Sequence, residues 1–136
     1  MIQQQCVSLQ DARRLVAAGE EKARDIGQPM NIAVVDPGGH LVAFAHMDGA
    51  WKGSIDIAIN KAFTSAMFKL PTKGLSEKAQ SGGPFFGIHV SNHGRVMIFD
   101  GGVPLMRDED IVGAVGVSGG DNQQDQTVAE AAAKAL

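Results

Sequence analysis

The amino-acid sequence predicts an α+β domain in which helices pack on a five-stranded antiparallel sheet. Amphipathic helical patterns occur near both ends of the chain and in its middle. The short apolar runs typical of strands come in one group of two and one group of three, with only tight turns inside each group. Helices therefore separate the strands too rarely for a parallel βαβ fold. No repeat or linker divides the 136 residues, so we expect a single domain over residues 1–136.

The composition is typical of a soluble globular protein, with 44% hydrophobic and 20% charged residues. No apolar run approaches the roughly 18 residues of a membrane span. The net charge of −3, with scattered basic residues, argues against nucleic-acid binding. A single cysteine excludes a disulfide within the chain and a cysteine-based zinc cluster. Because the first ten residues also lack a signal-peptide pattern, we expect a cytoplasmic protein.

The first elements are a helix at 9–26 and a hairpin of strands at 31–35 and 40–45. Ser8 and Asp11 form a capping box that starts the helix, and Gly27 ends it. The turn sequence Asp-Pro-Gly-Gly at 36–39 connects two nearly continuous apolar runs. Such runs predict a sheet that is covered on at least part of both faces.

A second helix is expected from Ser54, as its N-cap, to about residue 68, where Pro71 follows. One stripe of small and aliphatic residues predicts its core face. The opposite stripe also repeats at helical spacing and consists of Ile57, Lys61, Thr64 and Phe68. Because Ile and Phe rarely face water on a helix, we expect a ligand, a partner subunit or the following segment to cover this second face.

The C-terminal half predicts a short helix at 75–80, a meander of three strands and a last helix. The strands are expected at 95–99, 103–106 and 111–118, separated by glycines at 101–102 and by a charged turn at 107–110. Asp121 is the expected cap of the helix that begins near residue 122.

Several residues are candidates for chemistry. His89 and His93 have the spacing of a helical metal pair, but their neighbours predict a loop, and we expect no metal. In the sequence GAVGVSGG, the glycines at 113 and 116 predict close packing of a helix on the sheet. Gly119 and Gly120 lie between a strand end and a helix N-terminus, where either a ligand carboxylate or water could bind.

Two further pairs are weighed as binding residues. His46 and Asp48 end the hairpin and could do acid–base work, but no further residue completes a catalytic set, and loop polarity explains them equally well. Lys61 and Thr64 lie one turn apart on the second helix face. A partly buried lysine needs an anion, which a ligand, Asp48 or a neighbouring subunit could supply; alternatively its amine stays in water.

Four motifs together resemble the GlcG/HbpS-like family, whose domain also forms the C-terminal part of PduO-type cobalamin adenosyltransferases. These motifs are AVVDPGGHLVAFAHMDGA, the helix with Lys61-Ala62-x-Thr64, GGVPL and IVGAVGVSGG. The resemblance spans nearly the whole chain and implies a profilin-like fold with sheet order 2-1-5-4-3. It also implies homo-oligomers, octamers in some members, and haem binding in some members. Other members belong to glycolate, glycerol or propanediol pathways.

The resemblance leads to three hypotheses. The first is an oligomeric protein that binds haem or a related tetrapyrrole, with Lys61 contacting a propionate and His46 as the axial candidate. The family often has arginine in place of His46, and the first helix here has no histidine, so His40, His89 and His93 stay open as alternatives. The second is an enzyme or accessory factor for small hydroxy acids, aldehydes or corrinoids. The third is a structural oligomer without a ligand, whose interface fills the face around Lys61.

Overall fold

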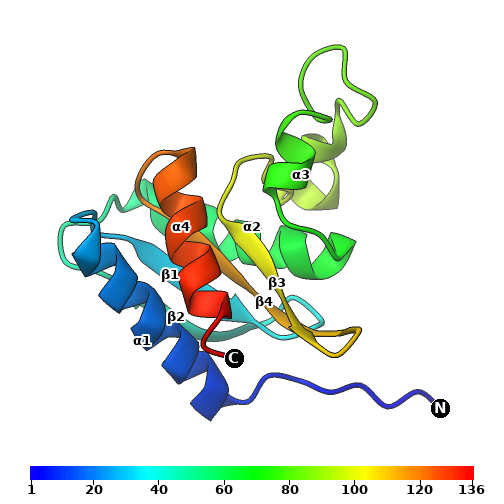
Figure 1. Cartoon of the computed structure of the whole chain (residues 1–136). Helices are drawn as coiled ribbons and strands as arrows, with labels where there is room; N and C mark the ends of the chain where they lie inside the picture. The colour runs from blue at the N-terminus through cyan, green and yellow to red at the C-terminus, as the bar shows by residue number, and fades with distance from the viewer.

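The computed structural model describes residues 1–136 and has helices on both faces of one antiparallel sheet (Figure 1). The strands are β1 (Asn31–Val35), β2 (Leu41–His46), β3 (Gly102–Arg107) and β4 (Asp110–Ser118), in the order β2-β1-β4-β3. The helices are α1 (Leu9–Asp25), α2 (Gly53–Phe68), the single turn α3 (Lys73–Ser76) and α4 (Asn122–Ala133). Short 3-10 turns occupy Ile88–Val90 and Asn92–Gly94.

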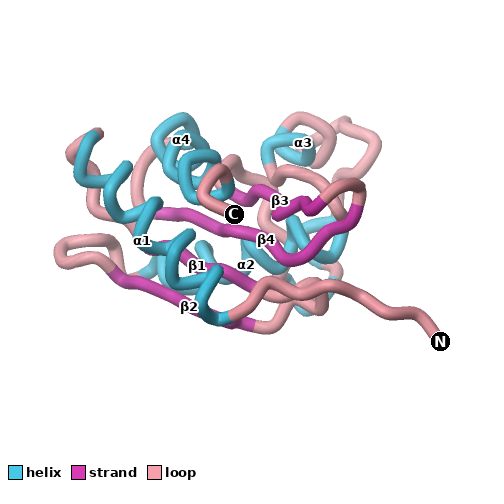
Figure 2. The backbone as a smooth tube through the Cα atoms, turned by 60° about the horizontal axis from the view of Figure 1, so that its bottom comes forward, coloured by secondary structure: helices cyan, strands magenta, loops and turns pink.

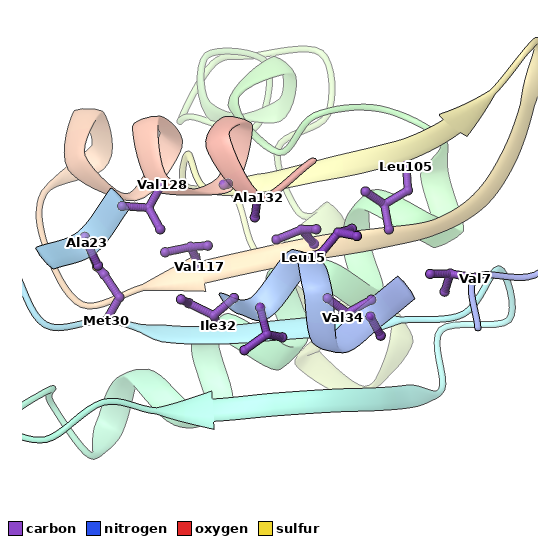
Figure 3. Packing of buried hydrophobic residues seen from close by; sticks show 14 of the residues in the cluster. Val7, Leu15, Ala23, Met30, Ile32, Val34, Leu105, Val117, Val128 and Ala132 are labelled. Carbon is purple, nitrogen blue, oxygen red and sulfur yellow. The ribbon is translucent and has the colours of Figure 1, made fainter. Parts of the chain in front are cut away.

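Helices α1 and α4 cover one face of the sheet, and α2 covers the other (Figures 1 and 2). The larger core cluster lies between the sheet and the α1–α4 pair, and Figure 3 shows its side chains, among them Leu15, Ile32 and Val117. A smaller cluster packs beneath α2. All five residues of β1 are buried, which confirms the prediction of a sheet covered on both faces.

Close approach of α2 to the sheet depends on Gly116 in β4. A Cβ atom built there would overlap the backbone of Ala58 and Ala62 in α2. The predicted packing role of this glycine is therefore confirmed. The capping box expected at Ser8 is formed, and the cap expected at Asp121 is formed as part of a second capping box with Gln124. Ser54, in contrast, lies inside the first turn of α2, whose cap position is Lys52 without a side-chain cap.

The prediction of five strands is wrong, because residues 95–99 form no strand. The N–H of Met97 donates to Oγ1 of Thr64 on α2 (2.9 Å) in place of a sheet partner. The guanidinium of Arg95 lies 3.6 Å from the centre of the Phe63 ring, also on α2. The apolar pattern of this segment reflects burial against the helix. The other four strands lie in the order that the resemblance implied for them.

Candidate functional site

Polar side chains gather at the end of the sheet where β1 begins and β2 and β4 end. Asn31 lies opposite His46 of β2 and also opposite Ser118 of β4. The N-termini of α2 and α4 lie at this same end of the sheet, because these helices follow β2 and β4 in the chain (Figure 1). Sequence analysis identified His46 here but gave no role to Asn31.

The buried amide of Asn31 fixes the tautomer of His46. Its Nδ2 donates to the carbonyl oxygens of Trp51 (2.9 Å) and Ser118 (3.4 Å), so its Oδ1 faces His46 and can only accept. The His46 Nδ1 contacts this oxygen and must therefore carry the proton. In the neutral form of this exposed imidazole, Nε2 therefore carries the lone pair, which is the form that binds a metal.

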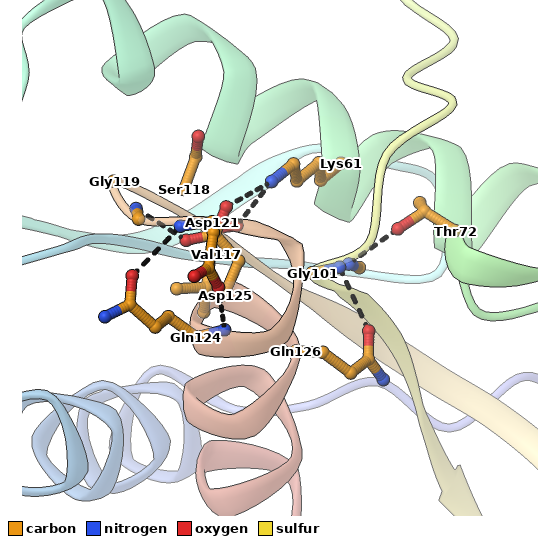
Figure 4. Close-up of polar contacts among 12 residues, drawn as sticks. Lys61, Thr72, Gly101, Val117, Ser118, Gly119, Asp121, Gln124, Asp125 and Gln126 are labelled. Carbon is orange, nitrogen blue, oxygen red and sulfur yellow. Dashed lines mark hydrogen bonds and ion pairs between the residues drawn. The ribbon is translucent and has the colours of Figure 1, made fainter. Parts of the chain in front are cut away.

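Lys61 is paired within the chain. Its side chain is 2% exposed, and Nζ donates to Asp125 Oδ2 and to the Val117 carbonyl oxygen, both at 2.9 Å (Figure 4). The sequence predicted an anionic partner, but the partner is Asp125 of α4 and not a ligand, Asp48 or another subunit. A signal for it was present, because Asp125 shares the apolar stripe of α4 with Val128 and Ala132.

Burial opposes both charges of this pair. Desolvation raises the pKa of Asp125, while the attraction of Lys61 and the backbone N–H of Gly120 act in the opposite direction. Desolvation likewise lowers the pKa of Lys61 against the attraction of Asp125. The lysine, the carboxylate and their backbone partners form a closed polar cluster inside the domain.

The glycine pair at the α4 N-terminus belongs to the same cluster. The Gly120 N–H donates to Asp125 Oδ1 (2.8 Å) (Figure 4). The Gly119 carbonyl accepts from Gln28 Nε2 (2.8 Å). The chain thus places its own carboxylate where a ligand anion was considered. Asp48 is exposed in the turn after His46, where β2 has already ended, so these two residues do not continue one strand.

Thr64 and Lys61 are buried on the second face of α2, whereas Ile57 is half-buried and Phe68 is 36% exposed. The Thr64 hydroxyl donates to the Asn60 carbonyl (2.7 Å) and accepts from the Met97 N–H. The segment that follows α2 thus covers this face at Thr64, β4 and α4 cover it at Lys61, and Phe68 stays exposed. Six residues were predicted to contact a ligand. Two are exposed, three are buried and one is half-buried: in this order, His46 and Asp48; Lys61, Thr64 and Gly119; Gly120.

The other histidines differ from His46 in their partners. His40 Nδ1 contacts the Asp36 carboxylate at 3.2 Å. His93 is exposed on a turn, and His89 is half-buried with an Nδ1 atom that has no hydrogen-bond partner. No three His, Cys, Asp or Glu side chains of the chain gather in a way that could hold a metal ion. None of the helices combines the length and hydrophobicity needed to cross a bilayer.

The fold and this sheet end define a small α+β domain with one solvent-facing imidazole above a closed polar cluster. The family model described as "Haem degrading protein HbpS-like" matches residues 7–134. The chain belongs to this HbpS-like family.

Relatives and solved structures agree with this assignment. A Citrobacter freundii protein, the 15.0 kDa protein of the dhaT-dhaS intergenic region, is 37% identical over 93% of this chain and 89% of that protein. Protein GlcG of Escherichia coli K12 is 39% identical over 82% and 81% of the two chains. The corrinoid adenosyltransferase PduO of Salmonella typhimurium is 32% identical over 96% of this chain, which spans only 39% of PduO.

Two solved structures share the fold. The Klebsiella pneumoniae protein ORFY has a TM-score of 0.97 at 37% identity, covering 99% of this chain and 93% of that one. The structure titled PduOC:Heme complex has a TM-score of 0.92 at 32% identity, covering 96% and 95%. Haem binding is therefore present in a close structural relative.

Proposed function

We propose that the protein binds haem or a related tetrapyrrole and that His46 is the axial ligand. The observation that carries this proposal is the fixed tautomer of His46, with Nδ1–H held by Asn31 and Nε2 free. Axial and metal-bound histidines typically have this arrangement, since the acceptor that binds the other ring N–H orients the ring and increases its basicity. The relative solved with haem supports the choice of ligand class.

The surroundings of His46 fit part of what haem requires. Trp51, whose carbonyl oxygen binds the same Asn31 amide, is 64% exposed and offers an apolar ring at the sheet end. Asp48 lies in the adjoining exposed turn. We assign Lys61, Thr64, Gly119 and Gly120 to the support beneath the site, because their polar groups bind within the chain. If haem binds here, His46 would hold its iron, and the haem would supply redox and small-ligand chemistry at this end of the sheet.

In this proposal the protein is a cytoplasmic homo-oligomer that binds the tetrapyrrole, and no reaction is assigned to it. Self-association, including an octamer, rests on the family resemblance. Sedimentation of the purified protein tests it directly, and a monomer at micromolar concentration would contradict it.

A haemin titration monitored by the Soret band tests the haem proposal. The wild type is expected to give a saturable, sharpened band, and His46→Ala to weaken binding by about tenfold or more and shift the band. His40→Ala is the matched control, because His40 is also exposed but is bound to Asp36. Identical titrations of wild type and His46→Ala would show that His46 is not the axial ligand. A broad, unsaturable wild-type spectrum would contradict haem binding itself.

The name of the relative PduO favours a corrinoid as the alternative ligand. A parallel titration with cobalamin separates the two. Saturable binding of cobalamin, together with an unsaturable haemin spectrum, would favour the corrinoid.

A further inference from the structure

A row of polar side chains crosses the end of the sheet on the face that α2 covers. In β4, Gly116 contacts α2, so the side chain of Ser118, two positions later, lies on the same face. Figure 4 shows this side chain directed toward α2. The register places Asn31 of β1 beside Ser118 and His46 of β2 beside Asn31. The first turn of α2 lies over the row, because the Asn31 amide binds the carbonyl oxygens of both Trp51 and Ser118.

Two serine hydroxyls meet here without a partner in the chain. Ser54, in the first turn of α2, lies four residues before Ala58, which packs on the sheet, so the Ser54 side chain faces the sheet at Ser118. Ser54 and Ser118 are each 5% exposed, and neither hydroxyl makes a hydrogen bond within the chain. Both oxygens keep some contact with solvent, because His89 Nδ1 is the only fully enclosed side-chain nitrogen or oxygen without a partner. A molecule from solvent can therefore reach them.

Helix α2 also begins without a capping side chain. Its cap position, Lys52, has helical φ and ψ angles of −64° and −37° and makes no side-chain cap bond. The N–H groups of Lys52 and Gly53 donate to no acceptor of the chain. Free N–H groups at the start of a helix carry partial positive charge and favour an anion. Lys52 adds a full positive charge, and the one acid of the first turn, Asp56, is exposed and accepts from Asn60.

We propose that a carboxylate group binds between the first turn of α2 and the Ser118 side chain. Its oxygens would accept from the hydroxyls of Ser54 and Ser118 and from the free N–H groups of Lys52 and Gly53. Each of these four groups is a donor that lacks an acceptor, and a carboxylate accepts several such bonds at once. A neutral ligand would use the hydroxyls but would gain little from the partial charge of the helix start.

Two sources can supply this carboxylate. One is a free small acid, which binds whether or not the protein binds haem. The other is a propionate of a bound tetrapyrrole, and this source rests on the haem proposal made above. The shared chemistry is the carboxylate itself, so the first test uses the simplest one.

Titration with acetate at constant ionic strength, followed by NMR on the full chain, tests the site. Acetate is expected to give one saturable set of shifts in the backbone amides of Lys52, Gly53 and Ser118. Acetamide is the matched probe, because it has nearly the same shape without the charge. It is expected to bind at least about tenfold more weakly, since hydrogen bonds to charged groups are the stronger ones.

Two variants and one control separate a binding role of the serines from a structural role. Ser54→Ala and Ser118→Ala are each expected to weaken acetate about tenfold. Their midpoints of urea unfolding should stay at the wild-type value, because neither hydroxyl binds within the chain. Ser65→Ala is the control, since this buried hydroxyl of the same helix donates to the Leu70 carbonyl. It is expected to lower the midpoint and to leave acetate binding unchanged.

Haemin and its dimethyl ester distinguish the two sources. If a propionate is the source, the wild type should bind haemin about tenfold more tightly than the ester, and Ser118→Ala should bind both equally. If a free acid is the source, the wild type should bind haemin and the ester equally, while acetate still saturates. Saturable acetate binding with an unsaturable haemin spectrum would keep this site and contradict the haem proposal.

Three results would overturn the carboxylate site. The first is acetate shifts that do not saturate, together with equal binding of haemin and its ester; saturable haemin binding would then leave the haem proposal standing alone. The second is equal affinity of the wild type for acetate and acetamide. The third is unchanged acetate affinity in both Ser54→Ala and Ser118→Ala. The wild-type titrations decide the question even if a variant fails to fold.

Discussion

The two polar clusters at the end of the sheet differ in whether the chain satisfies them. In the cluster of Lys61 and Asp125, both charged groups are buried and are bound to each other and to backbone groups. In the cluster of Asn31 and His46, the buried amide is satisfied but the exposed imidazole keeps one nitrogen free. The first cluster connects α2, β4 and α4, and the second connects β1 and β2 to the loop before α2.

This difference distinguishes polar groups that stabilise the fold from polar groups that remain available to a ligand. A buried charge that lacks a partner costs several kcal/mol, so a folded chain pairs such groups internally, as it does for Lys61. An exposed imidazole costs little when one nitrogen is free, and it can therefore be kept for a ligand. Its residue type made Lys61 the stronger candidate for ligand binding in the sequence. The hydrogen bonds in the structure favour His46 instead.

The largest effect is expected when the ion pair of Lys61 and Asp125 is disrupted by substitution. Lys61→Met leaves Asp125 buried without its cation and is expected to reduce the free energy of unfolding by about 3–5 kcal/mol. Lys61→Met with Asp125→Leu removes both charges and is expected to recover most of this loss, because burial disfavours both ionised groups. Urea unfolding monitored by circular dichroism measures both variants.

Lys73→Met is the control, since Lys73 is exposed, and its effect should stay within about 0.5 kcal/mol. A double variant as unstable as the single one would show that the pair contributes more than mutual neutralisation. Undiminished haemin binding by the folded double variant would confirm that Lys61 supports the fold and does not contact a propionate.

The role of the second cluster, formed by Asn31 and His46, is tested by substituting Asn31. Asn31→Leu leaves the carbonyl oxygens of Trp51 and Ser118 without this donor and His46 without its acceptor, so a loss of about 1–3 kcal/mol is expected. Haemin binding should weaken by less than in His46→Ala, because the iron-binding nitrogen is still present. Asn31→Asp keeps an acceptor and adds charge, which should make the reduction potential of bound haem more negative. Equal potentials in wild type and Asn31→Asp would contradict the orienting role of Asn31.

The sequence predicted most of the fold because its periodic patterns are local. The hairpin, the meander strands next to Gly102, the capping box at Ser8 and the cap at Asp121 depend on neighbouring residues, and these predictions are confirmed. The segment at 95–99 failed because its apolar residues pack on α2, a choice made by tertiary contacts with Thr64 and Phe63. The partner of Lys61 lies 64 positions away, and the role of Asn31 depends on three strands meeting, so neither follows from spacing alone.

Thr64 provides a smaller test of how the chain closes its own polar groups. Thr64→Val removes the acceptor of the Met97 N–H and is expected to cost about 1 kcal/mol. The loss should appear mainly as faster amide hydrogen exchange at Met97 and its neighbours, because this bond fastens their segment to α2. Thr64→Ser keeps the hydroxyl and is the control. Unchanged exchange at Met97 in Thr64→Val would mean that the side chains of the segment, and not this bond, hold it in place.

The smallest effect contrasts the half-buried carboxylate of Asp36 with the fully buried Asp125. Burial alone would raise the pKa of Asp36, but the backbone N–H groups of His40 and Gly38, with the His40 ring, lower it below 3.8. A lowered pKa in the folded state contributes stability above the unfolded value, and this stability is lost as the pH falls through the folded value. Relative to Asp36→Asn, the wild type should therefore lose less than about 1 kcal/mol, and only below about pH 4. Parallel urea titrations at pH 7 and pH 3 measure this, and a constant difference between the two proteins would show that Asp36 holds the turn without its charge.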